Sequence, residues 1–179
     1  MIADSGKTTD INKELLTKIQ QVLSDKGFET VILNSEKEVK DYINREIPDE
    51  QIVGLGDSIT TCTLNIRNIL YGKGSTIFYS WDGSETYNRS LDTFENMTKP
   101  AYYLSRATAI ASDGNILLKD YSKNAARKGS FPEKIYVFAG MNRLVEAFED
   151  RESVDKYALV DTLPANTKFS VALLPYLCY

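Results

Sequence analysis

Residues 51–60 read QIVGLGDSIT, and the interpretation of the whole chain starts from this stretch. It begins as a short apolar strand, Ile52–Leu55, and turns on two glycines one residue apart, Gly54 and Gly56. Glycine permits a tight turn and lets a ligand approach the backbone closely. A strand that ends in such a turn is the first place to expect a small-molecule site.

The residues after the turn favour a helix, which we expect to run from about Ser58 to Tyr71. A helix that starts here points unpaired N–H groups and the positive end of its dipole at the turn, which favours an anion. Capping and anion binding use the same N–H groups, so both roles stay open. The candidate capping and ligand-binding side chains are Asp57, Ser58 and Thr60.

The bulk composition is that of a globular protein. The 179 residues suit one domain, which we expect to span residues 1–179. The formal charge of −4, with both signs dispersed, argues against nucleic acid as a partner. No apolar run approaches the roughly 20 residues that span a bilayer, and the chain does not open with a signal-peptide pattern. We therefore expect a cytoplasmic protein with no membrane partner.

The chain contains no histidine, which excludes a Ser-His-Asp triad and a histidine-rich zinc site. Acid–base chemistry would have to use Asp, Glu, Lys, Tyr or Cys, and Asp57 is the candidate. Cys62 and Cys178 form neither a disulfide framework nor an iron–sulfur set, and we interpret them as ordinary buried thiols. We expect no metal and no cofactor.

Apolar runs of strand type alternate with helical patterns over most of the chain, which indicates an α/β domain with a mostly parallel sheet covered on both faces. Glycine and proline mark several element ends. The expected helices are Thr9–Lys26, one from Asn34 or Ser35 to Pro48, Ser58–Tyr71, one on Tyr87–Met97, and two short ones, Val145–Phe148 and Val154–Leu159. The expected strands are Phe28–Leu33, Ile52–Leu55, Thr76–Ser80, Ala101–Ser105, Ala107–Ala111, Ile116–Leu118, Lys134–Ala139 and an edge strand, Phe169–Leu174.

Three familiar motifs fail at the glycine turn. A dinucleotide fingerprint needs a third glycine where Ile59 stands. A phosphate loop needs Gly-Lys-Ser/Thr, which does not follow. A serine hydrolase needs a base for Ser58, and histidine is lacking.

A second cluster follows the strand Lys134–Ala139 directly and contains Gly140, Asn142 and Arg143. In open α/β sheets, ligands bind outside the carboxyl ends of the strands. Arg143 offers a bidentate fork to a carboxylate or phosphate, although a surface arginine in a turn is an equal alternative.

A third, basic cluster holds Asn124 between lysines and an arginine over residues 119–128. Such charge runs are most often solvated loops. Asn124 is nevertheless kept as a candidate ligand contact.

Taken in order, these clusters resemble the lactate-utilization (LUD) domain family. Residues 56–60 look like its Gly-Asp-Ser-Val-Thr turn, and Trp81 falls where the family often has Trp. Residues 109–114, Ala-Ile-Ala-Ser-Asp-Gly, are similar to its Asn-Ala-Ile-Thr-x-Asp-Gly segment. Residues 135–145 are similar to its strand followed by Gly-x-Asn-Lys-Ile-Val. The matches span about Gln51 to Val145.

The resemblance implies a three-layer α/β/α domain with the fold of ribose-5-phosphate isomerase, glucosamine-6-phosphate deaminase and coenzyme A transferases. It also implies a link to L-lactate oxidation beside iron–sulfur and oxidoreductase partners. The chain departs from the family at Thr108, where the family has Asn, and at Lys123-Asn124-Ala125, where it has Gly-Asn-Arg.

Three hypotheses follow. The first is a LUD-like domain that binds a small anionic metabolite between the Gly54–Thr60 turn and the Gly140–Arg143 turn. The second is a non-catalytic subunit that docks to an iron–sulfur or oxidoreductase partner. The third is an isomerase or deaminase of the same fold that acts on a sugar phosphate.

Overall fold

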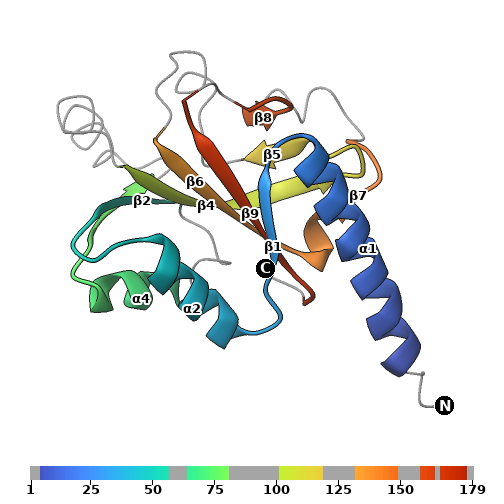
Figure 1. The fold of residues 1–179 in the computed structure, drawn as a ribbon, viewed down its shortest axis with the longest axis horizontal. Helices are drawn as coiled ribbons and strands as arrows, with labels where there is room; N and C mark the ends of the chain where they lie inside the picture. Colours follow the sequence, from blue (N-terminus) through green and yellow to red (C-terminus); the bar gives the residue numbers. More distant parts are fainter. Residues whose placement is uncertain are drawn as a thin grey trace.

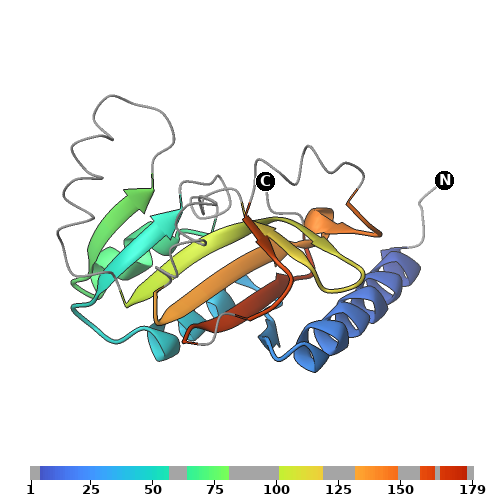
Figure 2. The ribbon, with the colours of Figure 1, turned by 90° about the horizontal axis from the view of Figure 1, so that it is seen from above.

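The computed structural model describes residues 5–56, 64–80, 101–118, 132–148, 158–163 and 166–176. Within them lies one nine-stranded sheet whose main path has the order β1-β9-β6-β4-β2-β3, and all neighbours along this path are parallel. Figure 2 shows β3, β2, β4, β6 and β9 side by side in this order. The path is formed by β1 (Glu29–Ile32), β2 (Ile52–Gly56), β3 (Thr76–Ser80), β4 (Tyr102–Ala111), β6 (Lys134–Gly140) and β9 (Lys168–Leu174).

Three short strands extend the sheet beyond this path. β5 (Ile116–Leu118) pairs antiparallel with β4 and with β8 (Ala158–Val160), while β7 (Leu144–Val145) pairs parallel with β4. The helices are α1 (Ser5–Asp25), α2 (Glu36–Glu46) and α4 (Ile66–Gly72), with a 3-10 turn, η1 (Met141–Arg143) (Figure 1). The expected antiparallel hairpin around Asp113 and the mostly parallel sheet are both confirmed.

Alternating side chains of the strands form two cores. One contains Val137 and Val171 and packs against α1, and the other contains Phe138 and Ala172 and packs against α2 and α4. Because successive strand residues point to opposite faces, the helices cover both faces of the sheet. This arrangement is the expected three-layer α/β/α architecture.

The second helix shows why local sequence predicts these elements well. Ser35 caps α2 by accepting from the Glu38 backbone N–H, and Val39, Tyr42 and Ile43 form the buried face. Ile47 ends the helix immediately before Pro48, as expected from the missing N–H and fixed φ of proline.

Three expectations about helices were wrong. The helix expected over Ser58–Tyr71 is not continuous: Asn65 adopts a left-handed φ of 55°, and α4 starts only at Ile66. Val145–Phe148 is not a helix, because Leu144 and Val145 pair with β4 as β7. The end of the expected helix Val154–Leu159 belongs instead to β8, which pairs with β5.

Two expectations about strands also need correction. Ala101–Ser105 and Ala107–Ala111 are parts of one strand, β4, with an irregular register between Ala107 and Ala109. Phe169–Leu174 is not at an edge, since β9 lies between β1 and β6. Every residue of β9 after Lys168 is buried, which is typical of a parallel strand covered on both faces.

No helix among the described residues is long and apolar enough to cross a membrane. The helix on Tyr87–Met97, like Trp81 and both cysteines, lies outside the described residues.

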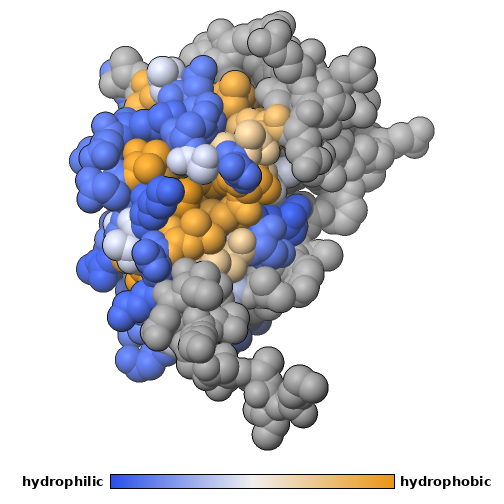
Figure 3. Space-filling model, turned by 90° about the vertical axis from the view of Figure 1, so that its right-hand side faces the viewer, coloured by the Kyte–Doolittle hydropathy of each residue, from blue (hydrophilic) through white to orange (hydrophobic). Residues whose placement is uncertain are grey.

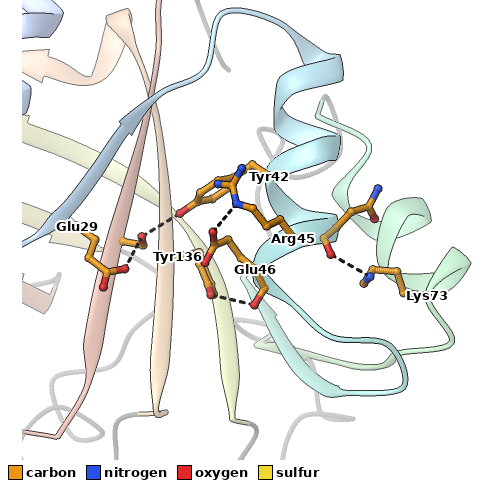
Figure 4. A network of polar contacts seen from close by, with 8 residues as sticks. Glu29, Tyr42, Arg45, Glu46, Lys73 and Tyr136 are labelled. Carbon is orange, nitrogen blue, oxygen red and sulfur yellow. Dashed lines mark hydrogen bonds and ion pairs between the residues drawn. The ribbon is translucent and has the colours of Figure 1, made fainter.

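A polar network fastens α2 to the sheet (Figure 4). The Tyr42 hydroxyl donates to Ser170 Oγ at 2.9 Å, and Ser170 Oγ donates to Glu29 Oε2 at 3.4 Å. The ring of Tyr136 meets that of Tyr42 edge-on at a centroid distance of 6.0 Å. Burial raises the pKa of Tyr42 to about 12, and burial followed by the charge of Glu46 raises the pKa of Tyr136.

These raised pKa values predict a loss of stability in alkali. The folded protein holds its phenolic protons more tightly than the unfolded chain does. These protons therefore contribute fully to the free energy of unfolding below the ordinary tyrosine pKa of about 10. The contribution of Tyr42 is lost as the pH rises from 10 towards its folded-state pKa of about 12. Tyr42→Phe removes one of these protons and a buried hydrogen bond, so it should cost about 1 kcal/mol at neutral pH and lessen the alkaline loss.

Urea unfolding at intervals between pH 7 and pH 11.5 measures both effects. Tyr71→Phe is the matched control, because Tyr71 is 50% exposed and its ring is retained. An alkaline slope in Tyr42→Phe equal to that of the unsubstituted protein would contradict this assignment.

Candidate functional site

The carboxyl ends of the parallel strands form an edge that β4 crosses. β4 pairs with β2 as far as Leu104 and with β6 as far as Arg106. Farther along, it pairs with β5 from Ala107 and with β7 from Ile110. Its partners therefore change on both sides near the irregularity between Ala107 and Ala109. Bulges of this kind re-aim side chains and often lie beside functional sites.

The neighbouring strands β2 and β4 form a topological switch point of the sheet. From β2 the chain continues to β3 on one side, and from β4 it passes through β5 to β6 on the other. Connections that diverge in this way leave a space outside the carboxyl ends of the two strands, where open α/β sheets bind ligands. Gly56 is the last residue of β2 and lies at this switch point. The expected turn at Gly54 was wrong, because Gly54 lies inside β2 and pairs with Phe78 and Tyr103 on the two neighbouring strands.

The second predicted turn lies at the end of β6. Gly140 pairs with Leu174 of β9, and the Met141 N–H donates to the Tyr176 carbonyl at 3.2 Å. In η1, the side chain of Asn142 is exposed and that of Arg143 is partly buried. These contacts give the turn a defined conformation directly after the strand.

The two glycines that end β2 and β6, Gly56 and Gly140, are not neighbours in the sheet. The register places Gly56 level with Ser105 and Val137, and Gly140 lies three residues farther along β6. A strand rises about 3.3 Å per residue, and neighbouring strands are about 4.8 Å apart. Gly140 is three residues farther along and two strands across from Gly56, so the two glycines are roughly 14 Å apart. β4 lies between them, so a small ligand that contacts both turns must also lie against β4.

Sequence reasoning missed Arg106 and Thr108 on β4 as site residues. Arg106 is partly buried, and no described carboxylate forms an ion pair with it. The Thr108 Oγ1 is buried and has no hydrogen-bond partner in the described part of the chain. The available signal was the interruption of an apolar strand, YYLSRATAIA, by polar side chains.

Several predicted site residues lie outside the described residues, namely Asp57, Ser58, Thr60 and Asn124. The first described helix after the turn, α4, starts at Ile66, ten residues beyond Gly56. Among the described residues, no group of three or more His, Cys, Asp or Glu side chains could hold a metal ion.

Comparison with protein families settles the membership of the chain. The family model described as the LUD domain matches residues 16–177. The chain belongs to the LUD domain family. The matched region of this LUD domain includes both glycine turns and the whole of β4.

A solved structure supports the fold of this LUD domain. A DUF162 family protein from Deinococcus radiodurans is similar with a TM-score of 0.58 and 13% sequence identity. The similarity covers 91% of this chain and 98% of that chain. At this identity the likeness shows a shared fold alone. A search of the curated proteins gave no match.

The buried hydroxyl of Thr108 predicts a stabilising substitution. A buried polar group without a partner costs about 1–3 kcal/mol, and Thr108→Val removes the hydroxyl while it keeps the shape. We expect the free energy of unfolding to rise by about 1 kcal/mol, which corresponds to a midpoint about 2–4 °C higher in a domain of this size. Thermal unfolding without any ligand measures the change.

Thr17→Val is the control, because Thr17 Oγ1 already donates a hydrogen bond to the Lys13 carbonyl at 2.9 Å. Removing this hydroxyl should not raise the free energy of unfolding. A destabilised Thr108→Val would mean that the hydroxyl has a hydrogen-bond partner.

Proposed function

We propose that this LUD domain binds a small anionic metabolite, a carboxylate or phosphate, at the carboxyl ends of the sheet strands and takes part in the use of lactate or another organic acid. The observation that supports this proposal is the topological switch point between β2 and β4, with Gly56 at the carboxyl end of β2. Membership of the LUD domain family supports the link to organic acids.

The proposed chemistry uses backbone and side chains together. Backbone N–H groups beyond Gly56 hold the anion, and glycine lets it approach closely. Arg143 adds a charged fork from the far side of β4. Asp57 hydrogen-bonds a hydroxyl of the ligand, or serves as acid–base if a reaction follows.

A second candidate function is docking to an iron–sulfur or oxidoreductase partner. Figure 3, which views the molecule from the side of α1, shows apolar atoms gathered at the centre of this face with polar atoms around them. Leu15 of α1 and Val145 of β7 are 39% and 37% exposed. Exposed apolar patches mark protein interfaces more often than scattered single residues do. Copurification with a redox protein favours this candidate, whereas a monomer that binds an anion tightly argues against it.

A thermal-shift panel tests the anion proposal. It contains lactate, pyruvate, sugar phosphates, coenzyme A thioesters, nucleotides and metal ions. A ligand at about 100 times its dissociation constant adds about 2.7 kcal/mol, which raises the midpoint by about 5–10 °C in a domain of this size. The sugar phosphates also test the isomerase or deaminase alternative. If none of the anions gives a shift, the proposal is wrong.

Substitution at the turn tests where the anion binds. Gly56→Val should abolish the shift because its side chain fills the space that the ligand needs beside the backbone, and Arg143→Ala should abolish it by removing the fork. Gly72→Ala is the control, since an added Cβ there meets nothing within 4 Å. Circular dichroism and the midpoint without ligand verify that each variant is folded. Full affinity in Gly56→Val and Arg143→Ala would contradict the proposed position.

A further inference from the structure

Arg106 differs from the other arginines of the described residues. Arg45 donates to Glu46 Oε1 at 3.0 Å and lies over the ring of Tyr42, and Arg67 lies over the ring of Tyr71 at 5.6 Å. Arg143 also has an interaction partner. Within the described part of the chain, Arg106 alone among these four has no ion pair, side-chain hydrogen bond or ring contact, although it is partly buried.

A partly desolvated cation without a counter-charge reduces stability. Removing a charge from water costs free energy that only a partner of opposite charge or a set of hydrogen bonds offsets. An arginine without an internal partner keeps its guanidinium fork available to a carboxylate or phosphate. Arg106 is therefore available to an anion.

The position of Arg106 agrees with this. Gly56 is level with Ser105, so Arg106 is the first β4 residue beyond the end of β2, at the topological switch point of the sheet. On its other side it pairs with Phe138 of β6, whose side chain is fully buried. An apolar wall lowers the local dielectric constant and strengthens an interaction between charges.

We infer that Arg106 is the main anion-binding residue of the site, a role that rests on the proposed function. Its guanidinium donates two parallel N–H bonds to the oxygens of a carboxylate or a phosphate monoester, next to the backbone of Gly56. The ligand is therefore a small molecule whose charged group lies at the switch point between β2 and β4. The rest of the ligand then extends along β4 towards Gly140.

The test compares Arg106→Gln, Arg106→Lys and the control Arg67→Gln by calorimetric titration. The probes are acetate, lactate, pyruvate, inorganic phosphate and glycerol phosphate, which separate carboxylates from phosphates. For each probe that binds the unsubstituted protein, Arg106→Gln should weaken binding at least tenfold, as expected for a charged hydrogen bond. Arg106→Lys keeps the charge but loses the fork and should give a smaller loss. Arg67→Gln should bind as the unsubstituted protein does.

Stability without ligand separates this role from a structural one. A ligand-binding arginine without a counter-charge predicts an unfolding midpoint for Arg106→Gln that is equal to or above that of the unsubstituted protein. Probes that bind Arg106→Gln and the unsubstituted protein equally would overturn the inference and leave the proposed function intact. Failure of every probe to bind the unsubstituted protein would overturn the proposed function and this inference with it. If Arg106→Gln does not fold, the affinity of Arg106→Lys is the test. An affinity equal to that of the unsubstituted protein would show that the two parallel N–H bonds of the guanidinium are not needed, and would overturn the inference.

Discussion

The architecture depends on the hydrogen bonding of one strand, β4. In its ten residues it pairs with four other strands, first with β2 and β6 and then with β5 and β7. The first half belongs to the parallel sheet, and the second half continues beyond the ends of both neighbours. A parallel strand needs partners on both sides to satisfy its backbone groups. The short strands β5 and β7 meet this requirement where the pairing of β4 with β2 and with β6 stops, so β4 changes partners at the carboxyl edge.

The two cores hold this edge in place from opposite faces. Buried residues of β4, β6 and β9 alternate between the α1 side and the side of α2 and α4, so a shift of register by one residue would exchange the two sets. Because both sets are apolar, each strand is held by its neighbours and by helices on both faces. The switch point between β2 and β4 thus lies on packed strands, and rigid elements place side chains more accurately than loops do.

The elements with strong local patterns could be predicted from the sequence. Lys134–Gly140 is an apolar run that ends in glycine, and α2 has a serine cap and a clear apolar face. The strands β7, β8 and β9 were misjudged in type or position because pairing with distant residues decides them. Leu144 and Val145 pair with Ile110 and Ala111, and β9, the last strand in the chain, lies between β1 and β6.

The same reason explains which part of the site the sequence revealed. Gly56 and Gly140 could be found because glycine at a strand end is a local signal. Arg106 and Thr108 could not, since their position depends on where the pairing of β4 with β2 and with β6 stops. Within the described part of the chain, neither side chain has a hydrogen-bond or ion-pair partner. Natural proteins depart from consistent local and tertiary preferences chiefly at functional or strained sites. β4 thus departs from a purely apolar strand at the point where its pairing partners change, which is why we look for the proposed site there.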